Sequence, residues 1–297
     1  MIMKIISKNP FRDTKLSGYQ GYFKKASVVV LAIALFLVVY SLLLSFASPN
    51  HYAAAHIGET EAVVESAGGT YIGAVADAYY EGEGEFRHLD GSVYEGSFSK
   101  SQRSGQGTFR FANGDVYTGS WANDEMVEGT YTFVDGRTYQ GKFEDGRFTS
   151  GVFSLGSQAA ALGFREFSAD VEDGALSALN FTQQDGTHYN GALSGWAEIK
   201  YADGNTYAGN VQQGVRSGQG TFRWRSADGT EIASYVGTWQ DDQMNGLGTY
   251  RYTKDVYPCL TGTFKQGVPD GEMKYAKNSS KTFKAIWKDG ACTQVKE

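Results

Sequence analysis

The sequence predicts an all-β repeat array: an antiparallel meander of consecutive β-hairpins, elongated and twisted, with one N-terminal transmembrane α-helix. Three observations predict this fold class. The octet RSGQGTFR occurs twice without change, at 103–110 and 216–223. An aromatic residue followed two positions later by glycine recurs through most of the chain. One long stretch without any charged residue, 26–47, lies near the N-terminus.

The composition agrees with short strands joined by tight turns. The 297 residues include 38 glycines, 19 tyrosines and 18 phenylalanines, but only 4 prolines. Aromatic residues favour strands, and glycine supplies the turns between them. Because residues 1–25 contribute +5 to the formal net charge of -6, the rest of the chain carries -11. Such an acidic remainder argues against nucleic acid or an anionic membrane surface as its main partner.

Residues 26–47 are predicted to form a single transmembrane helix and to make the membrane one partner of the chain. The segment is long enough to cross ~30 Å of hydrocarbon. Six Lys/Arg residues precede it and none follows before Arg87. The positive-inside rule therefore places a basic tail, 1–25, in the cytoplasm and the repeats outside it, at the cell membrane. Cleavage after a signal peptide, at the small residues 53–55, is the alternative.

A linker is predicted at 48–68, because Pro49 cannot continue a helix. His51 and His56 stand in this linker without a further ligand type at metal spacing, so a solvated segment is favoured over a metal site.

The repeat array is predicted to cover 69–297, with degenerate copies around 152–186 and 253–297. Ten starts, the last copy being truncated, predict roughly 19 strands. Seven starts show the full aromatic-x-Gly pattern, at Tyr71, Tyr94, Tyr117, Tyr139, Tyr189, Tyr207 and Tyr235. Three further starts are degenerate, at Phe167, Leu260 and Phe283.

Each unit is expected to be one hairpin. Residues 94–98 and 105–111 both alternate with period two, which is typical of half-buried strands, and 99–104 form a polar turn. The turn length predicts that Gly96 faces Gly107, Tyr94 faces Phe109 and Phe98 faces Gly105.

Three further expectations concern the neighbours of this hairpin. On its far edge, Tyr117 is expected to face Phe111, and Trp121 to face Gly107. Large rings would then cover glycines, as aromatic rescue does in designed sheets. Of the two arginines in the octet, Arg103 and Arg110 are both expected to face water.

Lysines crowd the last predicted strands. We favour an edge cap over a basic binding patch for them, because charged edge residues block association between sheet edges. The cluster consists of Lys277, Lys281, Lys284, Lys288 and Lys296.

The repeat resembles the MORN (membrane occupation and recognition nexus) repeat, in which aromatic-x-Gly, a second aromatic and a polar turn precede Gly-x-Gly. Residues 94–98 with 105–109, 207–209 with 218–222, and 235–239 with 246–250 match this pattern. The resemblance covers about 69–290 and departs from the pattern near Phe167, Tyr189 and Leu260. It implies a β-hairpin scaffold that binds proteins, self-associates or contacts lipid, without catalysis.

The aromatic face offers candidate binding residues, because uncovered rings give a partner a stacking surface. The alternative for each ring is that it only covers glycines and neighbouring strands. The candidates are Tyr117, Trp121, Tyr139, Phe143, Tyr207 and Trp239.

No catalytic, cofactor or metal site is predicted. Gly105-Gln106-Gly107 recurs with the hairpin period and lacks a following helix, so it is not a nucleotide loop. Glu81, Glu83 and Glu85 would share one face, where a solvated surface is favoured over a cation site. Cys259 and Cys292 are the only cysteines, and a disulfide between them stays open beside two free thiols.

The sequence thus favours a non-catalytic, membrane-anchored scaffold that binds an unknown protein partner, or itself as a homo-oligomer, outside the cytoplasm. Binding of lipid or an envelope surface is the second hypothesis, although the charge of -11 opposes anionic lipid. An envelope enzyme acting on glycan is the third, and it would need a defined pair of carboxylates.

Overall fold

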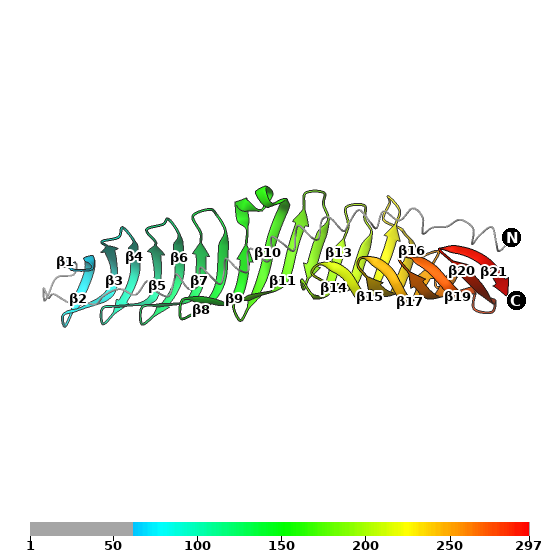
Figure 1. The fold of residues 1–297 in the computed structure, drawn as a ribbon. Coiled ribbons are helices and arrows are strands. Elements are labelled where there is room, and N and C mark those ends of the chain that lie inside the picture. Colours follow the sequence, from blue (N-terminus) through cyan, green and yellow to red (C-terminus); the bar gives the residue numbers. More distant parts are fainter. Residues whose placement is uncertain (1–61, 297) are drawn as a thin grey trace. The chain divides into compact units, whose positions relative to one another are not determined.

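The computed structural model describes residues 62–296, which fold into 21 β-strands and two short 3₁₀-helices (Figure 1). The predicted tail, transmembrane helix and most of the linker, 1–61, lie outside these residues. Among the residues that are described, no helix has the length and apolar character needed to cross a membrane. The all-β antiparallel meander is confirmed, with slightly more strands than expected.

The first of two compact units covers 62–177 and consists of hairpins that follow one another in chain order (Figure 1). Its strands are β1 (Ala62–Ser66), β2 (Gly69–Ala76), β3 (Tyr79–His88), β4 (Val93–Ser99), β5 (Gln102–Arg110), β6 (Val116–Ala122), β7 (Glu125–Thr132), β8 (Thr138–Glu144), β9 (Arg147–Ser154) and β10 (Phe164–Glu172). Two 3₁₀-helices, η2 (Gly156–Gln158) and η3 (Ala160–Leu162), interrupt the chain between β9 and β10.

The second unit covers 178–296. Its strands are β11 (Ala175–Gln183), β12 (His188–Gly191), β13 (Gly195–Lys200), β14 (Thr206–Gln212), β15 (Val215–Arg225), β16 (Glu231–Gln240), β17 (Gln243–Arg251), β18 (Cys259–Lys265), β19 (Val268–Ala276), β20 (Thr282–Lys288) and β21 (Ala291–Lys296).

Within the hairpin β4–β5, two of the three expected residue pairs are confirmed. Tyr94 faces Phe109 and Gly96 faces Gly107. The third expectation is wrong: Phe98 faces Arg103, because a β-bulge between Gly96 and Phe98 shifts the register. A bulge places two residues opposite one and bends the strand, so the hairpin curls beyond its glycines.

The expected pairing across β5 and β6 is wrong by two residues. Tyr117 faces Phe109, and Trp121 faces Gly105. The reason is that Phe111 is not in the strand but begins the turn, where its N–H bonds Asp115 O at 2.9 Å. The turn therefore takes up residues that the sequence pattern assigned to a longer strand.

Each hairpin contributes one residue per strand to rows that cross the sheet. In the first unit, the aromatic row of β2–β9 consists of Tyr71, Phe86, Tyr94, Phe109, Tyr117, Tyr131, Tyr139 and Phe153. In each strand a glycine lies two positions from the aromatic residue, after it in one strand of a hairpin and before it in the other. This glycine row consists of Gly73, Gly84, Gly96, Gly107, Gly119, Gly129, Gly141 and Gly151.

These two rows and the large rings beside them form the core. Trp121 makes edge-to-face contacts with Tyr94 and Tyr117, at centroid distances of 5.3 and 5.1 Å. Edge-to-face pairs align the positive edge of one ring with the negative face of the next. Phe143 repeats this arrangement on Tyr117 and Tyr139, so the packing passes from hairpin to hairpin.

Two of the three degenerate starts occupy the predicted position in the repeat. Leu260 and Phe283 face Tyr250 and Tyr275, in the same row as the aromatic residues. The start assigned to Phe167 is wrong, because Ala169 faces Phe153. The irregular segment that carries η2 and η3 precedes this strand, and it removes the hairpin spacing on which the alignment depended.

Candidate interaction surface

The tyrosine of the aromatic-x-Gly pattern caps the bulge of its own hairpin. The Tyr94 hydroxyl donates a hydrogen bond of 3.0 Å to Ser97 O, at the bulge that separates Gly96 from Phe98. A buried carbonyl needs such a partner. The same bond to the carbonyl three residues on is made by Tyr71, Tyr117, Tyr139, Tyr189, Tyr207 and Tyr235.

The tyrosine ring also explains the glycine row. A Cβ added at Gly107 would lie 2.3 Å from the Tyr94 hydroxyl oxygen, and at Gly220 it would lie equally close to Tyr207. Rings therefore do cover glycines, as expected. The covering ring, however, comes from the partner strand of the same hairpin.

All six candidate binding residues lie in the core. Tyr117 and Tyr139 are 0% exposed, and Phe143, the most exposed of the six, is 6% exposed. The others are Trp121, Tyr207 and Trp239. Their contact with a partner stays a prediction, but in the described residues each ring packs against glycines and neighbouring rings.

The expectation that Arg103 faces water is wrong. It is 3% exposed, and its guanidinium carbon lies 4.2 Å from the centroid of the Trp121 ring. Asp124, in the turn of the next hairpin, accepts from Arg103 N at 2.9 Å and from Nε at 3.2 Å. Burial lowers the pKa of the Arg103 guanidinium, and Asp124 opposes this shift. Arg110, in contrast, is exposed as expected.

Arg216, the equivalent residue of the second octet, repeats these contacts. It is 0% exposed, and its backbone N–H and its Nε–H donate to Asp242 Oδ1 at 2.9 and 3.0 Å. Its guanidinium carbon lies 4.5 Å from the Trp239 ring centroid. In both octets the arginine therefore closes one hairpin onto the next.

The sequence contained a signal for this pair that local alternation did not use. Met244 occupies the strand position that Arg103 has in its own hairpin, since it faces Trp239 as Arg103 faces Phe98. In the turn of the next hairpin, the position of the acidic residue is taken by Gly267, whose N–H bonds Met244 O at 2.9 Å. The turn position is acidic where the strand position is arginine, at Asp124 and Asp242, and it is glycine where the strand position is Met244.

The buried tyrosines should ionise only as the fold is lost. Desolvation raises the pKa of Tyr139 and of Tyr201 to about 12, from 10.0. The pKa of these tyrosines is higher in the folded state than in the unfolded state. Their protonated hydroxyls therefore contribute fully to the stability of the fold below pH 10, and this contribution is lost as the pH rises towards about 12. In an alkaline titration, core tyrosinate absorbance should rise together with loss of the β-sheet circular dichroism. Ionisation of these tyrosines with an unchanged sheet signal would contradict this prediction.

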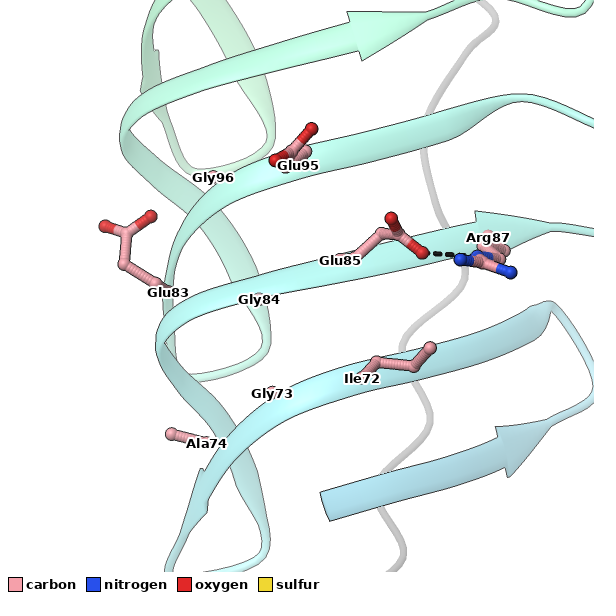
Figure 2. A pocket seen from close by; sticks show the side chains of 9 residues that line it. All are labelled: Ile72, Gly73, Ala74, Glu83, Gly84, Glu85, Arg87, Glu95 and Gly96. Carbon is pink, nitrogen blue, oxygen red and sulfur yellow. Dashed lines mark hydrogen bonds and ion pairs between the residues drawn. The ribbon is translucent and has the colours of Figure 1, made fainter. Parts of the chain in front are cut away.

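The opposite, outer face of the sheet carries the accessible side chains. Over β2–β4 it is hollowed into a groove of about 560 Å³ (Figure 2). We call this the acidic groove. It is lined by Ile72, Gly73, Ala74, Glu83, Gly84, Glu85, Arg87, Glu95 and Gly96.

Carboxylates dominate the acidic groove. Glu85 points along β3 towards Arg87, with which it forms an ion pair, whereas Glu95 stands directly opposite Glu85 on β4 (Figure 2). Ser97 Oγ donates to Glu83 Oε1 at 2.5 Å. Glu81, which is not among the residues that line the groove, accepts from the Lys100 N–H at 2.8 Å. No group of three or more metal-ligating side chains is found within 62–296.

Lysines form a second charged feature on β19–β21. Lys274 faces Lys284, and Lys284 faces Lys296. We call these three residues the lysine ladder. All three are exposed. Of the lysines assigned to an edge cap, Lys277 and Lys281 lie in the turn before β20, where the Lys277 N–H bonds Lys281 O at 2.9 Å. The edge cap stays a prediction.

Both cysteines are free thiols. Cys259 is buried and Cys292 is partly exposed, and burial raises the pKa of each thiol.

Curated relatives match only a short part of this chain. Alsin from Rattus norvegicus and from Homo sapiens are each 29% identical over 87 residues, which is 29% of this chain. The chain spans 5% of the length of these relatives.

Solved structures are similar at low TM-scores. The TCP10 domain of Danio rerio CPAP, in complex with a peptide of STIL, has a TM-score of 0.40 at 14% identity, over 73% of this chain and 95% of that domain. The TCP domain of Drosophila melanogaster SAS-4, in complex with a proline-rich motif of Ana2, has a TM-score of 0.23 at 11% identity. This similarity covers 69% of this chain and 92% of that domain.

The family comparison matches the description "MORN repeat" at 94–116, 117–136, 207–228 and 235–255. The first two segments span β4–β7, and the last two span β14–β17. They include the bulged hairpins in which a tyrosine caps the bulge. Four segments of this chain, within its antiparallel β-meander, are therefore MORN repeats.

Proposed function

We propose that this protein is a non-catalytic interaction scaffold that binds a protein partner through the outer face of its sheet. The observation that carries the proposal is the acidic groove, which three consecutive strands form on that face. The aromatic face is filled by its own side chains, with Tyr94, Tyr117 and Tyr139 at 0% exposure. A partner would have to unfold hairpins to reach these rings, whereas the groove needs no rearrangement.

The groove suits recognition by an extended or loop segment with positive charge. Its three carboxylates outnumber the single Arg87, and Ile72 adds an apolar contact beside them. Charge complementarity of this kind directs partner choice and the rate of encounter. The absence of catalysis is part of the proposal, and MORN repeats support it.

Membrane anchoring through 26–47 is also part of the proposal, supported by the uncharged length of that segment. The flanking charges favour a cytoplasmic 1–25 and an extracytoplasmic array. Intact cells expressing the chain would be treated with a membrane-impermeant amine reagent. Lys281 and Lys288 should be labelled while Lys4 stays unlabelled until the cells are opened. Labelling of Lys4 but not Lys281 would refute this topology.

Photo-crosslinking in membranes tests the groove directly. A photoreactive residue in place of Glu95 should crosslink to a protein, whereas the same residue in place of Glu144 should not. Glu144 is also an exposed carboxylate of the same unit, at the end of β8 and outside the groove. Equal crosslinking at both positions, or none at Glu95, would refute the groove as the binding site.

A further inference from the structure

We propose that the partner of the acidic groove is a second copy of this chain, whose lysine ladder docks there. Copies would then associate head to tail. The inference rests on the proposed role of the groove and names its occupant. Three observations support it: the like charges within each surface, the opposite charge between them, and the net charges of the residues around them.

Each surface holds like charges in unfavourable positions. Lys274, Lys284 and Lys296 stand directly opposite one another across three strands. Like charges at such cross-strand positions destabilise a sheet. Glu272 relieves this repulsion only in part, since it lies 3.0 Å from Lys284 Nζ and 3.9 Å from Lys296 Nζ.

The groove shows the same arrangement with the opposite sign. Glu85 and Glu95 stand directly opposite each other on β3 and β4, and Arg87 forms an ion pair with Glu85. A surface that brought positive side chains between these carboxylates would remove the repulsion. The lysine ladder has the required charge and also spans three neighbouring strands, as the groove does.

The charge difference extends beyond these side chains. Residues 62–99 contain seven Asp/Glu and one Arg, a net charge of -6. Residues 259–296 contain seven Lys and three Asp/Glu, a net charge of +4. A groove therefore repels another groove, and a ladder repels another ladder, whereas a groove attracts a ladder. Of the three possible contacts between two copies, groove with groove, ladder with ladder and groove with ladder, the charges therefore favour only the last.

The selected contact joins two different surfaces. Each added copy leaves one groove and one ladder unoccupied, so a heterologous contact of this kind continues into an open assembly unless the rotation closes a ring. Individual exposed ion pairs contribute little. The association should therefore depend on several charges together and weaken strongly with salt.

Sedimentation of the full chain in a non-ionic detergent tests this inference. At about 0.05 M salt, the mass of the particles should rise with protein concentration, and at about 0.5 M salt the rise should disappear, because the Debye length shortens. Reversing the groove (Glu83→Lys, Glu85→Lys, Glu95→Lys) or the ladder (Lys274→Glu, Lys284→Glu, Lys296→Glu) should weaken association by about tenfold or more.

Two matched controls carry the same charge changes elsewhere. Glu125→Lys, Glu144→Lys, Glu172→Lys reverses three exposed carboxylates of the first unit, outside the groove. Lys200→Glu, Lys254→Glu, Lys265→Glu reverses three exposed lysines of the second unit, outside the ladder. Both controls should associate as the unmodified chain does.

A charge swap separates the contact from misfolding. The groove-reversed and ladder-reversed chains should each stay unassociated alone and associate when mixed, and a chain carrying both reversals should recover self-association. Failure of both rescues would overturn the inference, as would association of the unmodified chain that survives the groove reversal. A crosslink from position 95 to a different protein, without self-association, would overturn it and leave the proposed function standing. No crosslink at all would remove both.

Discussion

Replacing Gly107 with valine is expected to destabilise the hairpin β4–β5 by about 3 kcal/mol, near the upper end of what overpacking costs. A Cβ at this position would lie 2.3 Å from the Tyr94 hydroxyl oxygen and 2.5 Å from ring carbon Cε2. Either the ring leaves its site or the two strands separate. The Gly107 backbone is not in the left-handed region, so the cost comes from the contact and not from backbone strain.

Displacement of the ring would remove two stabilising contributions together. Tyr94 is 0% exposed, and its hydroxyl bonds Ser97 O at 3.0 Å. The partly buried carbonyl at the bulge would lose its partner when the ring moves, and the loss of such a hydrogen bond costs about 0.5–1.5 kcal/mol. Trp121, which packs edge-to-face on the same ring at 5.3 Å, would lose that contact as well.

Hydrogen exchange read strand by strand is the suitable measurement, because a repeat array need not unfold in one step. Protection should fall in β4, β5 and β6 of the Gly107→Val chain and change little in β8 and β9. Arg110→Ala, in the same strand but exposed, should leave exchange nearly unchanged. Unchanged protection of β4 and β5 in Gly107→Val would contradict the account of the glycine row.

A second substitution tests whether the ring is the obstacle. Tyr94→Ala vacates the space that a side chain at Gly107 would occupy. The double variant Gly107→Val, Tyr94→Ala should therefore cost clearly less than the sum of the two single changes, since residues in contact are not additive. Strict additivity would show that the strands, and not the tyrosine, limit the space.

The register could be predicted from sequence up to the bulge and no further. Period-two alternation was enough to pair Tyr94 with Phe109 and Gly96 with Gly107, because it fixes which residues share a face. The shift at Phe98 comes from the bulge, which Tyr94 caps through its hydroxyl in the closed hairpin. Period-two alternation alone does not place a bulge, and the hairpins that start at Leu260 and Phe283 also carry one without a tyrosine there.

The burial of Arg103 could not be predicted from alternation for a related reason. Exposure is the usual state of arginine, and the counter-charge, Asp124, comes 21 residues later, from a different hairpin. The octet contains the arginine of this ion pair but not the aspartate, so its repetition alone does not reveal the pair. Comparison of each strand position with the turn position of the next hairpin would have found the other half.

The candidate binding residues show how periodicity can mislead about function. The regular recurrence of Tyr117, Tyr139 and Tyr207 reflects the capping of the bulge in their own hairpins, which is a contact within the fold. Side chains that distinguish one part of the array from another, such as Glu95 and Lys284, lie on the outer face and break the repeat pattern. A partner that recognises one place on the array needs such differences.

Asp242→Gly should destabilise the second unit by about 3–5 kcal/mol, because it leaves the buried Arg216 without its counter-charge. Arg216 is 0% exposed, and Asp242 Oδ1 accepts both its N–H and its Nε–H. Glycine is a matched replacement for the backbone, since Asp242 has a φ of 64°. The loss therefore reports the missing carboxylate. Urea unfolding followed by tryptophan fluorescence would measure it, with four of the five tryptophans in this unit.

The chain itself supplies the rescuing variant. Met244 and Gly267 occupy the strand and turn positions that correspond to Arg216 and Asp242, and Met244 is also 0% exposed. The double variant Arg216→Met, Asp242→Gly should therefore recover most of the lost stability. Replacement of a buried ion pair by apolar groups is often neutral or better, and here Arg216 Nη1 and Asp242 Oδ2 have no hydrogen-bond partner to lose. If the double variant were as unstable as Asp242→Gly alone, the arginine would stabilise the unit through its stacking on Trp239 and not through the carboxylate.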